Sequence, residues 1–342
     1  MQVLLRVRIS DSRSIRPHLV NLISDFLILG KDILPEAVTL NDKLLQYLTT
    51  NRLLPLVFYI LHKNAFVIDG SHIKVLRDAY NSSIANFLIV EDQYRRIKKA
   101  LKNVQYIVFK GISASSTLYP LPYLRPQGDI DIIVQEDAIN TCIELLEKHG
   151  YKMVKNPDPS SEYTLPILPK HREGLLVDIH MDLKRRDMRK IPFRELLDNA
   201  YPTEHGLFLK PPALLVSLTV HAHLHWFILP LINWLDIALM VNKMDCKEIY
   251  QAYELARRWG FERAFVYSTG IACELWGISP PHLPRIVSTK TSIKILNIIS
   301  AIRSGFISKV SKALTFYIFM ERDMKTSYII ERALYYIKDI TR

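Results

Sequence analysis

A short run, Asp-Ile-Asp-Ile-Ile-Val at residues 129–134, constrains the fold of this chain more than any other segment. Its β-branched residues favour a strand, and its length is that of a strand buried within a sheet. Successive side chains of a strand point to opposite faces, so Asp129 and Asp131 share one face while the isoleucines beside them enter a core. The segment therefore predicts a buried strand that carries two neighbouring carboxylates.

Other β-rich runs lie in the same part of the chain, at residues 104–109, 163–168 and 174–183. Helical patterns alternate with them. Residues 139–150 repeat apolar side chains at helical spacing and end in a glycine, and residues 112–119 can form a short helix. Strands mixed with helices in one compact stretch indicate a small α+β unit.

The rest of the chain reads as helix, because apolar residues recur there at intervals of three and four. We therefore predict an α+β fold in three parts. A small mixed β-sheet core occupies residues 101–190, an N-terminal helical region occupies residues 1–100, and a C-terminal helical region occupies residues 191–342.

Composition excludes several classes of protein. The 342 residues are 49% hydrophobic and 23% charged, so the chain can bury a core and is not of the disordered type. Its three cysteines are widely spaced, which disfavours a disulfide framework or a zinc knuckle and indicates a reducing compartment. The N-terminus does not read as a signal peptide and no apolar stretch is long enough to span a bilayer. We expect a soluble, cytoplasmic protein.

The net charge of +11 favours anionic partners such as nucleotides, sugar phosphates, nucleic acid or anionic lipid, without choosing among them. Much of the excess lies in residues 281–342, whose amphipathic spacing fits a packed helical cap better than an RNA or membrane contact. A second basic cluster lies within residues 184–190. It reads either as a solvated loop or as a binding surface for an anionic acceptor.

The paired aspartates suggest a metal site. Two carboxylates held side by side repel each other, a divalent cation relieves that repulsion, and hard oxygen ligands suit Mg²⁺. The Asp-x-Asp motif is short, so a pair of solvent-facing aspartates at a strand edge is the competing interpretation. Asp178 lies in the run 174–183, where it shares a face with His180. A third carboxylate on an adjacent strand would complete a two-metal site for in-line displacement.

Residues upstream of the pair fit phosphate binding. Lys110 and Gly111 follow a predicted strand directly, and glycine lets a backbone approach a phosphate closely. The hydroxyl of Ser113 and the first amides of the next helix can bind phosphate oxygens. Arg125, four residues before the first aspartate, can engage two oxygens at once. These residues are the predicted nucleotide-binding contacts.

Together these motifs resemble the active-site signature of the polymerase-β-type nucleotidyltransferase superfamily. More narrowly, they are similar to an uncharacterised bacterial and archaeal nucleotidyltransferase family. The matching elements are Asn51-Arg52-Leu53-Leu54-Pro55-Leu56, Lys110-Gly111, Leu118-Tyr119-Pro120, Arg125, Asp129-Ile130-Asp131, Asp178-Ile179-His180, His221, His225 and Trp234-Leu235-Asp236. One departure concerns the phosphate contact. The superfamily often places Gly-Ser or Gly-Gly close before the aspartates, whereas here Ile112 separates Gly111 from Ser113 and the gap to Asp129 is long.

The resemblance implies that the β-sheet core is a Mg²⁺-dependent nucleotidyltransferase domain. Asp129 and Asp131 would hold one Mg²⁺ that binds the triphosphate. With Asp178 they would hold a second that lowers the pKa of an acceptor hydroxyl, and Mn²⁺ could replace either ion. The hydroxyl would attack the α-phosphorus of an NTP such as ATP, and pyrophosphate would leave.

The resemblance also implies a substrate cleft lined by His180, His221, His225 and Asp236, with Asp236 bonding a histidine. His180 reads equally well as a hydrogen-bonding residue at a strand end. His221 and His225 have a spacing that can bind a metal ion, but apart from Asp236 no acidic residue or cysteine lies at a suitable distance from them in the sequence.

The acceptor is open and could be a small molecule, a glycan, a peptide or a protein. Two alternatives also stay open. One is transfer of the sugar from a nucleotide-sugar at the same site. The other is a non-catalytic protein that binds nucleic acid or a partner, as in a toxin–antitoxin pair. Three converging carboxylates disfavour binding alone.

Overall fold

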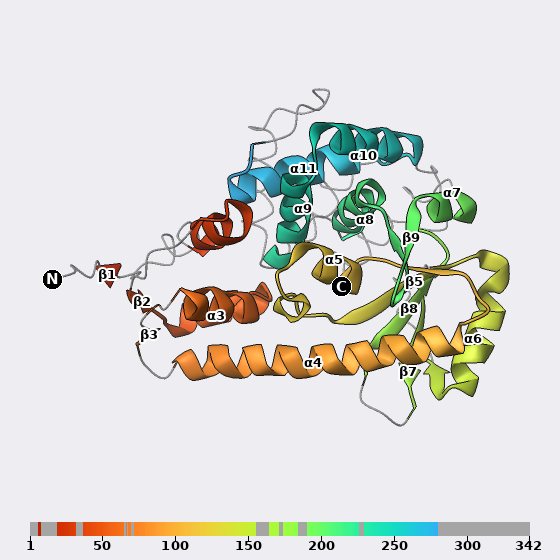
Figure 1. The fold of residues 1–342 in the computed structure, drawn as a ribbon, viewed down its shortest axis with the longest axis horizontal. Helices are drawn as coiled ribbons and strands as arrows, with labels where there is room; N and C mark the ends of the chain where they lie inside the picture. Colours follow the sequence, from red (N-terminus) through yellow and green to blue (C-terminus); the bar gives the residue numbers. More distant parts are fainter. Residues whose placement is uncertain are drawn as a thin grey trace, which may run out of the picture.

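The computed structural model describes residues 6–7, 19–31, 37–64, 66, 68–69, 72–154, 164–170, 174–183, 190–225 and 229–279. They form a seven-stranded mixed β-sheet with helices packed around it, which confirms the predicted α+β fold (Figure 1). The basic segments 184–189 and 281–342 lie outside the described residues.

The sheet has the strand order β6-β7-β8-β5-β4-β10-β9. Its strands are β4 (Tyr106–Val108), β5 (Asp129–Val134), β6 (Tyr151–Met153), β7 (Thr164–Pro169), β8 (Leu176–His180), β9 (Ala200–Thr203) and β10 (Gly206–Leu209). The predicted strand at 129–134 is β5, in the middle of the sheet. It pairs in parallel with β8 and antiparallel with β4.

Two strands fall where the sequence indicated only helix. The hairpin β9–β10 extends the sheet beyond residue 190, and β10 pairs in parallel with β4. Each of the two strands has four residues, too few to show a clear alternation. Gly206 at the turn has φ of +131°, a value that only glycine adopts readily.

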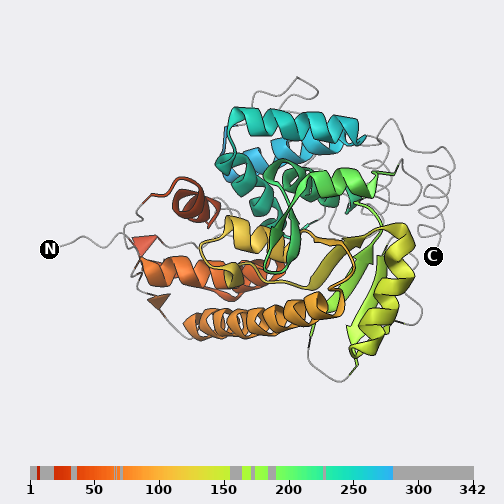
Figure 2. The ribbon, with the colours of Figure 1, turned by 45° about the vertical axis from the view of Figure 1, so that its right-hand side comes forward.

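The helices lie on both sides of the sheet. They are α2 (Asp42–Thr50), α3 (Leu54–Lys63), α4 (His72–Ala100), α5 (Gly111–Leu118), α6 (Ile139–Lys148), α7 (Phe193–Asp198), α8 (Pro211–Leu224), α9 (Leu231–Lys243), α10 (Cys246–Arg258) and α11 (Glu262–Trp276). The long helix α4 and α6 cover one side, and α5, α8 and α9 lie on the other (Figures 1 and 2). No helix within the described ranges is both long and apolar enough to cross a membrane.

The side chains of β5 divide between two cores. Ile130 and Ile132 pack with Tyr94 of α4 and Cys142 of α6. Ile133 faces the other way, into the core formed mainly by the helices α3, α5, α8, α9, α10 and α11. Because side chains alternate along a strand, Asp129 and Asp131 share the face of Ile133. The strand therefore presents its carboxylates to the side covered by α5, α8 and α9.

A second, small sheet lies in the N-terminal region, which was expected to be helical. It consists of β1 (Arg6–Val7), β2 (Ala37–Thr39) and β3 (Ile68–Asp69), all parallel. These pairings join segments about 30 residues apart along the chain, and strands of two or three residues leave no periodic pattern in a sequence.

Candidate active site

Strand pairing brings two aspartates side by side. In the parallel pair β5–β8, Asp131 stands opposite Asp178. Both side chains therefore lie on the same face of the sheet. With His180, two residues further along β8, they place three ligating atoms within 4.8 Å of one another. Asp129 adjoins this group, because it precedes Asp131 by two residues on the same strand face.

Asp131 is the centre of the charge network. Its Oδ1 accepts a hydrogen bond from Lys110 Nζ at 3.1 Å and lies 2.8 Å from His180 Nε2. Burial alone would raise the pKa of this carboxyl, but Lys110 and the His180 hydrogen bond hold the pKa of Asp131 well below its usual range. Asp131 is therefore ionised throughout the physiological pH range.

The other two carboxylates are less well compensated. The charge of Asp131, followed by burial, raises the pKa of Asp129. Burial, followed by the charges of Asp131 and Asp129, raises the pKa of Asp178 to about 6. Mutual repulsion of this kind is what a divalent cation offsets, and two aspartates with an imidazole form a suitable ligand set. The residues present thus fit a divalent metal ion.

Lys110 approaches the carboxylates from a strained turn. It is the N-cap of α5 and has φ of +57°, which is rare for a residue with a side chain. The ammonium lies 4.5 Å from the centre of the Phe109 ring, as well as on Asp131. Strain at such a position is typical of a functional site, where the surrounding contacts hold the backbone in place.

The first turn of α5 lies close to the carboxylate strand. A Cβ on Gly111 would meet the Asp129 carbonyl oxygen at 3.6 Å, so this residue packs against the start of β5. Ser113 is fully buried, and its hydroxyl has no hydrogen-bond partner among the residues that the structure describes. A buried donor without a partner is available to a ligand.

Arg125 and Asp236 lie in one buried cluster. Arg125 Nε donates to both carboxylate oxygens of Asp236, at 2.9 and 2.8 Å, and Nη2 lies 2.7 Å from Oδ2. The Tyr119 hydroxyl donates to the same carboxylate at 2.8 Å. The guanidinium that was expected on a phosphate is thus bound within the protein. Asp236, which was expected to bond a histidine, has Arg125 and Tyr119 as its partners instead. A fully buried carboxylate requires a cation or donors, and arginine matches its geometry.

The histidines of α8 lie at the end of that helix. The rings of His221 and His225 are 4.4 Å apart between centroids. Burial, followed by the charges of Lys110 and His225, lowers the pKa of His221 well below its ordinary value, while Asp131 opposes this shift. His221 is thus a neutral ring within range of the charges of Lys110 and Asp131.

The sequence interpretation assigned no role to Gln93 or Tyr119. Gln93 is fully buried on α4 and makes two backbone hydrogen bonds to Leu175, the residue before β8. Tyr119 was noted only as part of a motif, yet it shares Asp236 with Arg125. No local sequence pattern predicts either contact, because each joins segments far apart in the chain.

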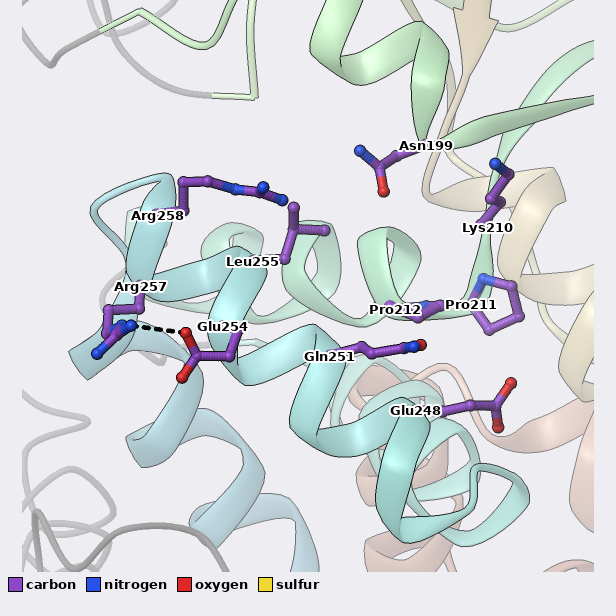
Figure 3. Close-up of a pocket in the computed structure, with 10 residues that line it drawn as sticks. All are labelled: Asn199, Lys210, Pro211, Pro212, Glu248, Gln251, Glu254, Leu255, Arg257 and Arg258. Atoms are coloured by element: carbon purple, nitrogen blue, oxygen red, sulfur yellow. Dashed lines mark hydrogen bonds and ion pairs between the residues drawn. The ribbon is translucent and has the colours of Figure 1, made fainter.

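A separate pocket of about 830 Å³ lies at the N-terminal end of α8 (Figure 3). It contains Pro211, about 15 Å along the helix from His221. Its charged groups have partners within the protein. Arg257 bonds Glu254, Arg258 bonds Glu195, and Lys210 donates to the Asp198 carbonyl oxygen. The pocket contains none of the predicted site residues.

A mixed sheet with an aspartate cluster beside a lysine-bearing turn is the arrangement that the sequence resemblance led us to expect of a nucleotidyltransferase. The chain belongs to the family described as uncharacterised nucleotidyltransferase, whose model matches residues 39–277. No curated protein matches the sequence significantly.

Among solved structures, those found to be similar are distant. The solution structure of the antibiotic-resistance factor ANT(2'')-Ia has 13% identity, a TM-score of 0.35, and coverage of 48% of this chain and 89% of its own. Its crystal structure with adenylyl-2''-tobramycin has 12% identity, a TM-score of 0.36, and coverage of 48% and 95%. JHP933 from Helicobacter pylori has 12% identity, a TM-score of 0.30, and coverage of 69% and 96%. Similarity at this level does not carry over a substrate.

Proposed function

We propose that this protein transfers a nucleoside monophosphate from an NTP to a hydroxyl group of an acceptor, in a reaction that depends on Mg²⁺. The alignment of Asp131 with Asp178 across the β5–β8 pair, with Asp129 on the same strand face, is the observation that carries this proposal. Three carboxylates on one face give the site a negative charge that the protein's own cations only partly offset.

Asp129, Asp131 and Asp178 would hold the metal, as two Mg²⁺ or Mn²⁺ ions. When bound, the metal neutralises phosphate charge and lowers the pKa of the acceptor hydroxyl. Lys110, which donates to Asp131, would turn to a phosphate oxygen. The buried Ser113 hydroxyl would donate to another.

Asp178 is the proposed proton acceptor. It stands opposite Asp131 in the β5–β8 pair, so a hydroxyl held at the metal ions would lie beside its carboxylate. As the acceptor oxygen forms its bond to the α-phosphorus, the bond to the pyrophosphate oxygen breaks, and the hydroxyl proton passes to Asp178. His180 lies among the carboxylates, and His221 is within range of the charges of Lys110 and Asp131. We propose both as contacts of the acceptor, with His225 beside His221.

Label position tests the reaction. The protein is incubated with each of four NTPs, labelled on either the α- or the γ-phosphate, with Mg²⁺ and a cell extract as the source of acceptors. We expect α-label, and no γ-label, to appear on an acceptor, with release of pyrophosphate and a nucleotide-sized mass increase. EDTA should prevent it. Transfer of a labelled sugar from a nucleotide-sugar, with no transfer of α-label from any NTP, would overturn the proposal.

A further inference from the structure

Arg52 occupies an unusual position between α2 and α3. Its φ of +57° is a value that, among the described residues other than glycine, only Lys110 shares. This conformation is strained for an arginine, and such strain persists where neighbouring structure requires it. Both strained residues carry a positive charge, and Lys110 binds the central carboxylate of the candidate active site.

The side chain of Arg52 reaches the start of the carboxylate strand. A Cβ on Gly128 would lie 3.4 Å from Arg52 Nη1 and 3.6 Å from Nη2. The guanidinium therefore rests on a residue without a side chain, directly before Asp129. The pKa of Asp129 is raised chiefly by the charge of Asp131, and Arg52 is one of the cations that oppose the increase.

The backbone that carries Arg52 is anchored through its neighbour, Asn51. The Leu231 amide donates to Asn51 Oδ1 at 3.2 Å, and the Ile232 amide donates to the Asn51 carbonyl oxygen at 3.4 Å. Asn51 Nδ2 in turn donates to the Tyr47 carbonyl oxygen. The strained turn is thus bonded to the first residues of α9, the helix that also holds Asp236.

The guanidinium of Arg52, unlike the backbone beside it, is free to bind a ligand. Arg52 is exposed, and its side chain makes no hydrogen bond or ion pair with the part of the chain that the structure describes. Arg125, the other arginine among the elements that match the family, is bound to Asp236. Arg52 is therefore the arginine beside Asp129 whose N–H groups are available to a ligand.

We propose that Arg52, resting on Gly128, is a binding subsite for the terminal phosphates of the nucleotide. The inference rests on the proposed function and extends it. An NTP adds several negative charges to those of the three carboxylates, more than two divalent metal ions and the partly buried Lys110 offset. A guanidinium can bind two phosphate oxygens at once, and Arg52 lies at the exposed end of β5. The N-terminal helical region would thereby contribute to a site otherwise built on the sheet.

The decisive variant is Arg52→Gly, because glycine adopts a positive φ without strain. Binding is measured by calorimetry with Mg²⁺ and an α,β-methylene NTP analogue, which cannot be cleaved at the α-phosphorus. We expect Arg52→Gly to weaken analogue binding by about tenfold or more and to leave binding of the nucleoside monophosphate unchanged. The melting temperature should be equal or higher. Arg52→Lys keeps the charge without the planar fork and should bind with intermediate affinity.

Two further variants complete the test. A Cβ at position 128 alone would already touch the guanidinium, so the larger side chain of Gly128→Val should displace Arg52 and weaken analogue binding while sparing the monophosphate. Arg77→Ala removes an exposed arginine from α4 and is the control, with no expected effect. If the wild type binds the analogue and Arg52→Gly binds it equally well, the subsite is overturned and the proposed function stays intact. Failure of the wild type to bind any NTP analogue would overturn both. Equal losses for analogue and monophosphate would also overturn the assignment to the terminal phosphates.

Discussion

Arg125 and Asp236 form a buried ion pair between the loop that precedes the carboxylate strand and the helix α9. The contact comprises two hydrogen bonds from Nε and a 2.7 Å contact from Nη2. Asp236 is completely buried, and burial raises its pKa despite the opposing charge of Arg125. The pair thus holds the loop that leads into β5 against the helix α9.

Breaking this pair should be costly. Asp236→Ala leaves the Arg125 charge buried without a counter-ion, so we expect a loss of about 3–5 kcal/mol in the free energy of unfolding, measured in urea. Asp92→Ala breaks the exposed pair with Arg96 and should cost less than about 1 kcal/mol. Equal effects of the two substitutions would show that the buried pair does not support the fold.

The carboxylate pair should be required for activity, and Asp129 should be dispensable for stability. Asp129→Asn and Asp131→Asn should each lower the rate of nucleotide transfer about a thousandfold or more, because each removes a proposed metal ligand. The free energy of unfolding of Asp129→Asn should stay equal or rise, since the repulsion from Asp131 is removed. Asp78→Asn, on the exposed face of α4, is the matched control. Wild-type rates in both site variants would contradict the mechanism.

Metal binding should depend on the protonation of Asp178. Below pH 6 the carboxyl carries a proton that a cation must displace, so affinity for Mg²⁺ should fall about tenfold per pH unit below 6 and level off above it. Calorimetric titration between pH 5 and 8 measures this profile. Asp178→Asn should bind Mg²⁺ weakly and lose the dependence around pH 6.

In the metal-free protein, protonation of Asp178 stabilises the fold, whereas it weakens metal binding. The pKa of Asp178 is higher in the folded protein than in the unfolded chain, so the folded state binds the proton more strongly. Its contribution to stability is present below the unfolded pKa and is lost as the pH rises through about 6. In EDTA, the unfolding free energy of the wild type should therefore fall relative to that of Asp178→Asn as the pH rises from 4 to 7. A constant difference would contradict the raised pKa.

Gln93 should stabilise the strand that carries Asp178. Its side-chain amide donates to the Leu175 carbonyl oxygen and accepts from the Leu175 amide, both at 2.8 Å. Gln93→Leu leaves both backbone groups without partners and should lower the free energy of unfolding by about 2 kcal/mol or more. Hydrogen exchange at the Leu175 amide should accelerate. Gln46→Leu, on the exposed side of α2, is the control. Unchanged exchange at Leu175 would refute this role.

Much of the sheet was predictable because strand patterns are local. The runs at 104–109, 129–134, 163–168 and 174–183 all contain strands, and the short helix expected at 112–119 is α5, which spans Gly111–Leu118. The hairpin β9–β10 and the small parallel sheet were not predictable. Their strands are short, and their place is decided by pairing with distant segments.

The sequence by itself determined that Asp129 and Asp131 share a strand face, because side-chain alternation is a property of the backbone within a few residues. Tertiary structure alone decided which groups meet them. The register of β5 with β8 aligned Asp178 with Asp131, and helix packing paired Arg125 with Asp236. The anchored turn at Arg52 set a guanidinium against Gly128. These contacts join residues far apart in the chain, so they depend on packing and strand register, which no local pattern specifies.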